Sequence, residues 1–426
     1  MTAVPRTQVF ISGMLLLACL AGTVSAASIG TEWKERAYGD SPFSGVEFSK
    51  DGDYVWAGGS QMIVCSWDGS EKWGGWAGFI TAMTGDLDRI VTGIGQGMFV
   101  LNKNTTDIWS RNMEGPIRAV AISNDGRYVI SSDEKGNYNS WSKNGDRLLA
   151  RTTDNLAKQI AVSPTNNLVV ATTVDGLRFY TPTLTSIWSD NKSGSLDTWI
   201  IITSDGKTVI TAGGNRVSSY TSDGEKNWMV YPTTEAIIDI AANPDGSAII
   251  IGSQDGTVLA VDRYGKTRWT YKAGQWINAV AISDTATVIA AGGLDGTVYL
   301  FDRAGSVIAK KKMESGIQPR SLALSSNGKR LAVADMRYLY ALSVIGGGDT
   351  PEVVSTYTPP PLEPVRTYQT WDTPTPEPTT MVPTIETTIP PTTPAPAPTQ
   401  QSPAGVLPLI GALVAAAVLL AGLRRK

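Results

Sequence analysis

Residues 240–269 carry a pattern that recurs along most of the chain, and they read IAANPDGSAIIIGSQDGTVLAVDRYGKTRW. Short apolar or β-branched runs alternate here with turns at Asp245-Gly246, Asp255-Gly256 and Gly265, and Trp269 follows four residues after the last glycine. An Asx-Gly pair between two apolar runs is the strongest short-range signal of a hairpin, because the turn needs positive φ. The stretch therefore predicts an antiparallel unit of four short strands.

The same pattern begins eight times, at intervals near 40 residues. The starts are Val46, Ile80, Ala119, Ile160, Trp199, Ile240, Ala279 and Leu322. Each leads through an apolar run and a turn to a β-branched run, although the second copy is the most degraded. Four short strands in each 40-residue unit are typical of a propeller blade.

The fourth strand of each unit has a recurring tryptophan position. Its occupants are Trp73, Trp109, Leu149, Trp188, Trp228, Trp269 and Ala309. The eighth unit ends after three strands, but Trp33 stands 40 residues before Trp73, so an N-terminal strand is expected to complete the last blade and cover its edge. We predict an all-β, eight-bladed β-propeller over residues 28–346. A seven-bladed ring would discard the second unit, against which Trp109 argues.

The six tryptophans at this position are expected to be structural and to pack between adjacent blades. They are Trp33, Trp73, Trp109, Trp188, Trp228 and Trp269.

Residues 259–269 resemble the tryptophan-docking repeat of quinoprotein-like (PQQ-like) β-propellers, and residues 298–305 match its first part. The Ser-x-Asp-Gly turns are also similar to WD40-type repeats. This resemblance covers residues 31–345 and implies the fold more than an activity. The chain lacks the vicinal cysteine pair and the inserted loops of the quinone enzymes, so it looks like the non-catalytic scaffolds with short blades.

Residues 1–27 have the features of a secretory signal peptide: Arg6, an apolar run over residues 9–20, and the small residues Val24-Ser25-Ala26. The apolar run is too short to span a bilayer. An alternative is a lipoprotein cleavage box ending at Cys19.

Two further segments follow the repeats. Residues 347–403 contain 15 Pro and 15 Thr among 57 residues, a composition that predicts a disordered, extended stalk. Residues 404–426 predict one transmembrane helix, with 19 uncharged residues from Gly405 to Leu423 before a basic tail that stays cytoplasmic. The layout also resembles a C-terminal sorting signal, so cleavage of this segment stays open.

The overall composition limits the function. A net charge of −3 argues against nucleic-acid binding, and the absence of histidine removes the commonest general base and metal ligand. The two cysteines cannot form a disulfide framework, because Cys19 falls within the predicted signal peptide. No cofactor and no metal site is expected, and the closed ring is expected to be monomeric.

Loops that enter the innermost strands of a propeller surround its central channel. Arg118, Lys158 and Arg320 occupy three of these eight channel-mouth positions, where they can attract an anionic group. Trp199 and Trp276 lie beside the same loops and suit glycan stacking or a protein contact. Ordinary solvated charge and packing between blades are the alternatives. Asn104 and Asn191 begin glycosylation sequons.

Together these features predict a membrane-anchored propeller on the extracellular face of the cell membrane. We expect a non-enzymatic binding or scaffold module for protein or glycan partners. One alternative is a quinone-dependent or other propeller enzyme of the cell envelope, and another is a structural component of that envelope.

Overall fold

The computed structural model describes residues 27–37, 42–76, 78, 80–190 and 197–346. Residues 1–26 of the predicted signal peptide, the predicted stalk and the predicted transmembrane segment lie outside these residues, as does Asn191. Within the described ranges, no helix has the length and hydropathy needed to cross a membrane.

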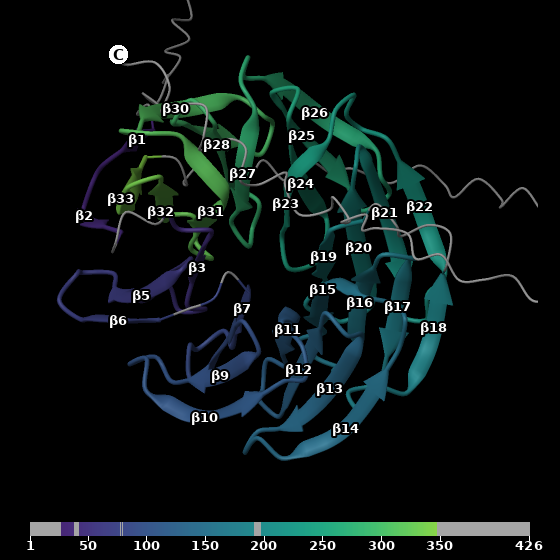
Figure 1. The fold of residues 1–426 in the computed structure, drawn as a ribbon. Coiled ribbons are helices and arrows are strands. Elements are labelled where there is room, and N and C mark those ends of the chain that lie inside the picture. The colour runs from purple at the N-terminus through teal and green to yellow at the C-terminus, as the bar shows by residue number, and fades with distance from the viewer. Residues whose placement is uncertain (1–26, 38–41, 77, 79, 191–196, 347–426) are drawn as a thin grey trace, which may run out of the picture. The chain divides into compact units, whose positions relative to one another are not determined.

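The described residues form eight antiparallel sheets, which we call blades 1 to 8 in the order of their first strands (Figure 1). Blade 1 comprises β3 (Gly45–Phe48), β4 (Tyr54–Gly58), β5 (Gln61–Ser66) and β6 (Lys72–Trp76); blade 2, β7 (Ile80–Met83), β8 (Ile90–Ile94), β9 (Gly97–Leu101) and β10 (Asp107–Asn112); blade 3, β11 (Ile117–Ile122), β12 (Tyr128–Asp133), β13 (Asn137–Ser142) and β14 (Arg147–Thr152); blade 4, β15 (Ala157–Val162), β16 (Val169–Thr173), β17 (Leu177–Tyr180) and β18 (Ser186–Asp190).

The remaining blades repeat this order. Blade 5 comprises β19 (Trp199–Ile202), β20 (Thr208–Gly213), β21 (Arg216–Thr221) and β22 (Lys226–Val230); blade 6, β23 (Ile237–Ala242), β24 (Ala248–Ser253), β25 (Thr257–Asp262) and β26 (Thr267–Lys272); blade 7, β27 (Ile277–Ile282), β28 (Val288–Gly293), β29 (Thr297–Asp302) and β30 (Val307–Lys312); blade 8, β31 (Ile317–Leu324), β32 (Arg330–Asp335) and β33 (Tyr338–Ile345). The predicted all-β, eight-bladed propeller is confirmed.

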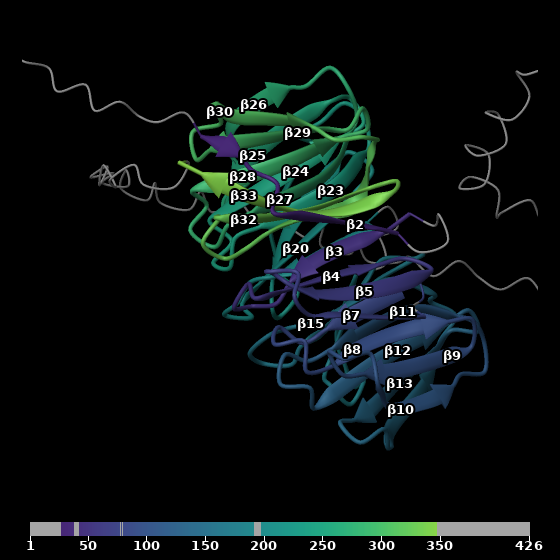
Figure 2. The same cartoon turned by 90° about the vertical axis from the view of Figure 1, so that its left-hand side faces the viewer.

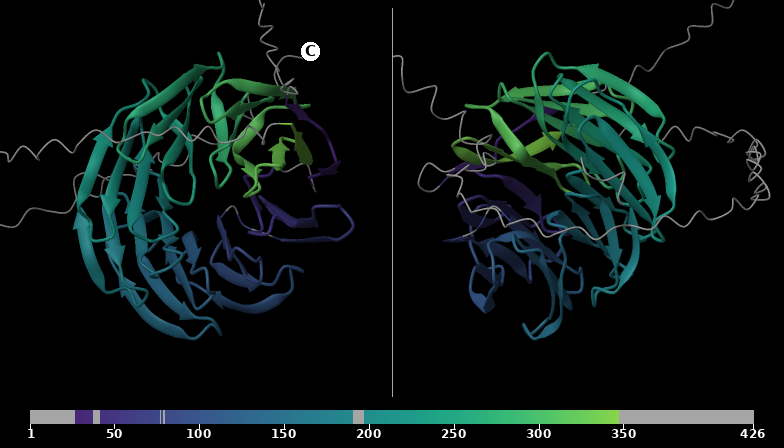
Figure 3. Two further views of the ribbon diagram at one scale, coloured as in Figure 1. Left: turned by 180° about the vertical axis from the view of Figure 1, so that it is seen from behind. Right: turned by 45° about the vertical axis from the view of Figure 1, so that its right-hand side comes forward.

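Two N-terminal strands complete blade 8. Strand β2 (Trp33–Arg36) pairs antiparallel with β33, with Trp33 opposite Ala341, and β1 (Ser28–Ile29) pairs with the other end of β33. The purple N-terminal strands lie beside the green and yellow C-terminal strands in every view (Figures 1, 2 and 3). The outer edge of β33 is therefore covered, as the position of Trp33 in the sequence predicted.

The hydrophobic core is divided into eight clusters, each between two consecutive blades. Between blades 8 and 1, Ala332 and Leu339 pack against Val55, Ile63 and the free thiol of Cys65. Burial raises the pKa of this thiol to about 11, so Cys65 is an inert core residue. Since the last and first blades share a cluster of the same kind as the other pairs, the ring is closed by packing as well as by strand pairing.

Most of the recurring tryptophans dock on the following blade. The indole lies against a glycine in the turn between the third and fourth strands of that blade, and every one of these glycines has a positive φ. The pairs are Trp33 with Gly69, Trp109 with Gly145, Trp188 with Gly224, Trp228 with Gly265, and Trp269 with Gly305. In four pairs the indole Nε1–H also donates to the carbonyl two residues before the glycine, as from Trp228 to Arg263 O at 2.6 Å.

Three of the eight positions depart from this arrangement. Ala309 stands in place of the blade 7 tryptophan, and blade 8 has no turn between its third and fourth strands, because β2 comes from the N-terminus. At the other two positions the turn residue changes as well. Trp73 faces a turn in which Thr105, at φ +60°, occupies the glycine position, and the Lys103 ammonium lies over its ring. Leu149 stands in place of the blade 3 tryptophan, and the turn of blade 4 has Leu184 at φ +57°. A side chain at this turn position is therefore found where no indole docks on it in the usual way.

Candidate functional site

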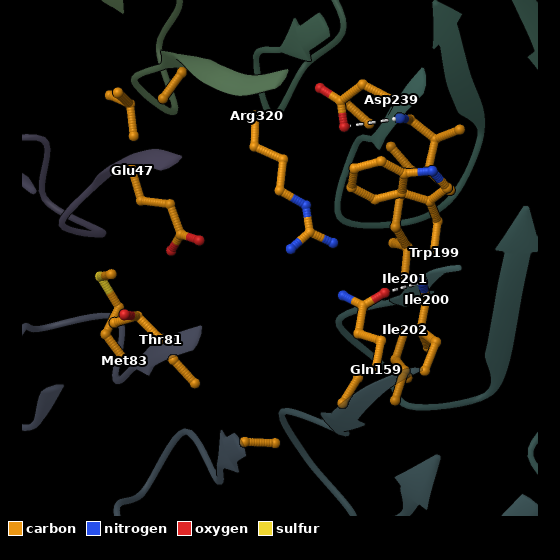
Figure 4. A pocket seen from close by; sticks show the side chains of 18 of the residues that line it. Glu47, Thr81, Met83, Gln159, Trp199, Ile200, Ile201, Ile202, Asp239 and Arg320 are labelled. Atoms are coloured by element: carbon orange, nitrogen blue, oxygen red, sulfur yellow. Dashed lines mark hydrogen bonds between the residues drawn. The ribbon is translucent and has the colours of Figure 1, made fainter. Parts of the chain in front are cut away.

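The innermost strands of all eight blades surround a central channel with a volume of about 950 Å³. Its charged lining residues are Glu47, Lys50, Arg118, Lys158, Asp239 and Arg320. Four of the five predicted channel-mouth residues, Arg118, Lys158, Trp199 and Arg320, line this channel. Figure 4 shows Arg320 pointing into it, with Trp199 and Asp239 on one side and Glu47 on the opposite side.

Arg320 owes its position to an insertion in blade 8. In blades 3, 4, 6 and 7 the first strand has a one-residue bulge, and six positions separate its first residue from the turn residue, as from Ile277 to Ser283. In blade 8 eight positions separate Ile317 from Ser325, and the register is interrupted from Ile317 to Leu322. The two extra residues enlarge the bulge, and bulges redirect side chains.

The backbone of Arg320 has φ +60°, the left-handed region that an L-residue adopts only at a cost of about 1–2 kcal/mol. The guanidinium lies over the Trp199 ring at 4.1 Å from its centroid, three blades away along the chain. The indole ring thus fixes the plane of the guanidinium. No described residue accepts a hydrogen bond from Arg320 or lies within ion-pair distance of it. Its five N–H donors are available to a ligand.

Two carboxylates act on Arg320 through space. Asp239 is buried and accepts hydrogen bonds from the N–H groups of Val280 (2.9 Å) and Ile240 (3.0 Å). Desolvation raises its pKa to about 7, against the opposing effects of these hydrogen bonds and of Arg320. Glu47 is open to the channel but deep within the ring, and desolvation also raises its pKa, while Arg320 lowers it.

The other two predicted cations are held by neighbouring groups. The Arg118 Nε–H donates to Ala157 O at 2.9 Å, which ties blade 3 to blade 4. Desolvation lowers the pKa of Lys158, and the buried carboxylate of Asp197 opposes that effect. Asp197 in turn accepts hydrogen bonds from Thr211 Oγ1 and Arg216 Nη2, both at 2.7 Å. These cations therefore have protein partners that Arg320 lacks.

The structure places two predicted residues away from the channel. Trp276 is 47% exposed in the loop before β27, and its carbonyl accepts the N–H of Leu294, but it is absent from the channel lining. Asn104 is exposed in the turn between β9 and β10, where a sequon needs to be, and its glycosylation stays a prediction.

Sequence reasoning missed Glu47 and Asp239, although both leave a signal. Glu47 stands two residues before its turn residue Ser49, where the other seven units have alanine or isoleucine. Asp239 stands four residues before Asn243, where the other units have no acid. A charged residue at a position that is uncharged in the other seven repeats is not explained by core packing alone.

The side chains of this channel can interact with charged groups. Among the residues that the structure describes, no group of three or more Cys, Asp or Glu side chains is arranged to hold a metal ion. The channel offers a guanidinium that bonds to no described residue, an aromatic face that fixes it, and two carboxylates with raised pKa values. Such a set recognises charged groups, with the guanidinium suited to a bidentate carboxylate.

The raised pKa of Asp239 makes stability depend on pH. The unfolded carboxyl ionises near pH 4 and the folded one near pH 7, so ionisation of the buried group costs increasing stability as pH rises between these values. Asp239 alone is expected to lower the free energy of unfolding by about 2–3 kcal/mol from pH 5 to pH 8, and the raised pKa values of Glu47 and Asp197 act in the same direction. Asp239→Asn should flatten this slope in urea titrations of the full chain. An unchanged slope would assign the pH dependence to other groups.

Among the comparisons with known proteins, those with solved structures agree on the fold. Residues 183–340 match a family of unknown function, DUF5711, and a search of the curated proteins finds no match. The chain is similar to the C-terminal WD40 domain of Sif2, with a TM-score of 0.61 and 15% identity over 74% of this chain and 98% of that one. It is also similar to the computationally designed Ika8 protein, with a TM-score of 0.61 and 17% identity over 71% and 96%.

A third similar structure is the β-propeller domain of Cps50 (Swd1) from Myceliophteria thermophila, with a TM-score of 0.51 and 14% identity over 74% of this chain and 100% of that domain. At such identities these likenesses establish the fold alone. The WD40-like resemblance is thus confirmed for the fold, and the quinoprotein-like resemblance stays a prediction.

Proposed function

We propose that this chain is a non-enzymatic binding module of the cell surface, which accepts a carboxylate of a protein or glycan partner at Arg320. The observation that carries the proposal is the Arg320 guanidinium, directed into the channel by a blade-specific insertion and stacked on Trp199 with its donors open. A charged side chain placed this way costs backbone strain that packing does not require, and such strain is concentrated at functional sites.

The location is proposed from the sequence of the two ends. A signal peptide at residues 1–27, a Thr/Pro-rich stalk and a C-terminal apolar segment with a basic tail would hold the propeller outside the membrane. On such a stalk the ring can meet large partners, which suits a receptor or scaffold.

The first experiment measures how the full chain binds carboxylates. Isothermal titration with trigalacturonate, and with a glutamate-rich peptide, should show binding by the wild type to at least one probe. Arg320→Gln should weaken that binding at least tenfold, because a charge-assisted hydrogen bond contributes about 1.5–3 kcal/mol. Arg320→Lys should recover little, since an ammonium has neither the planar fork nor the same stacking.

Arg118→Gln is the matched control, because it removes a guanidinium of the same channel mouth that is already bonded to Ala157 O. It should change the affinity less than threefold. If the wild type binds neither probe, or if both glutamine variants lose affinity equally, the role of Arg320 is wrong. Failure to bind combined with abundance in isolated envelopes would instead favour a structural component.

A further inference from the structure

Opposite charges face each other in the channel without meeting. Glu47 on β3 and Arg320 on β31 point toward the same space from adjacent blades (Figure 4). They affect one another electrostatically, yet they form neither a hydrogen bond nor an ion pair within 4.0 Å. The gap separates a hydrogen-bond donor array from a carboxylate acceptor, so it is polar at both ends.

The charged groups that act directly on Arg320 favour a ligand with a positive as well as a negative group, although the lining as a whole holds four cations and two acids. The two groups that act on this guanidinium through space, Glu47 and Asp239, are both acidic. An added carboxylate would gain hydrogen bonds from Arg320, but it would also be repelled by Glu47 and Asp239 in their ionised forms. A ligand that also carries a protonated amine removes this conflict, because the amine can donate to Glu47.

The two carboxylates are not equivalent as partners for such an amine. Asp239 is buried, and its oxygens already accept the N–H groups of Ile240 and Val280. Glu47 is open to the channel, and within the described part of the chain no donor bonds to its carboxylate. Glu47 is therefore the group that faces a ligand, whereas Asp239 lies on the Trp199 side of Arg320 and acts on it only through space.

We infer that the channel binds a zwitterion, whose anionic group is held by Arg320 and whose ammonium group is held by Glu47. This inference rests on the proposed function, since it uses the same guanidinium, and it adds the class of the ligand. The channel of about 950 Å³ has room for a small amino acid or for a charged end of a larger partner.

The test titrates the full chain with ω-amino acids of increasing length, namely glycine, 4-aminobutyrate and 6-aminohexanoate, so that the separation of the two charges is varied. Hexanoate and hexylamine serve as probes with one charge each. At least one amino acid should bind ten or more times more tightly than both single-charge probes. Glu47→Gln should remove that advantage and leave hexanoate binding unchanged or stronger. Met83→Leu, an uncharged change in the same lining, is the control variant.

The outcomes separate this inference from the proposed function. If hexanoate or trigalacturonate binds through Arg320 but no amino acid binds more tightly than hexanoate, the zwitterion is wrong and the carboxylate site stands. If Glu47→Gln leaves the amino-acid advantage intact, Glu47 is not the amine partner and the inference also fails. If neither carboxylate nor amino acid binds, both proposals are wrong.

Discussion

Replacing Gly224 by alanine is expected to lower the free energy of unfolding by about 2–5 kcal/mol. Gly224 has φ +91°, where an L-side chain costs about 1–2 kcal/mol. A methyl group there would also overlap the Trp188 indole. That indole cannot easily move aside, because its ring packs against Phe179 at 5.2 Å and Tyr220 at 5.8 Å. Overpacking of this kind costs a further 1–3 kcal/mol or so.

Two other glycines separate the cost of backbone strain from the cost of the clash with the indole. Gly265 and Gly274 share φ +78°, but a methyl group on Gly265 would lie 2.9 Å from the Trp228 ring, whereas one on Gly274 would meet nothing within 4 Å. In urea unfolding of the full chain, the loss should therefore decrease from Gly224→Ala through Gly265→Ala to Gly274→Ala. Equal losses at all three positions would mean that backbone strain alone is measured and that the docked indoles contribute little.

The fold was largely predictable because its signals repeat. Each Asx-Gly turn and each apolar run is weak evidence alone, but eight copies at one spacing fix the strand count and expose the missing strand near Trp33. The docking glycines were also visible, four residues before their own blade's tryptophan in several units. Their partner is the tryptophan of the preceding blade, and this could not be read from one unit, since the contact joins residues about 36 positions apart.

The candidate site was only partly predictable. Counting back from each turn residue identified Arg118, Lys158 and Arg320. That count gave the three cations equivalent positions, so it did not reveal the two extra residues of blade 8. The count therefore could not tell Arg118, which bonds to Ala157 O, from Arg320, which bonds to no described residue. The stacking of Arg320 on Trp199 could not be predicted either, because the two residues lie on different sides of the propeller. The distance between them depends on how the propeller closes, which the local sequence pattern does not give.

Deleting Gln318 and Pro319 is expected to weaken carboxylate binding at least tenfold without unfolding the propeller. The deletion restores the six-position spacing of blades 3, 4, 6 and 7, and Arg320 then takes the place that Arg118 has in blade 3. It also removes the need for a left-handed arginine, which offsets the lost stacking on Trp199. The free energy of unfolding should change by no more than about 1 kcal/mol.

The length-preserving variant Gln318→Ala/Pro319→Ala is the matched control, since it keeps the enlarged bulge. The most direct measurement is then the affinity of the full chain for trigalacturonate or the glutamate-rich peptide in three forms: wild type, shortened and alanine-substituted. We predict a loss of at least tenfold in the shortened form and a change below threefold in the substituted one. A shortened, folded chain that binds as tightly as the wild type would contradict the claim that the blade 8 insertion builds the site.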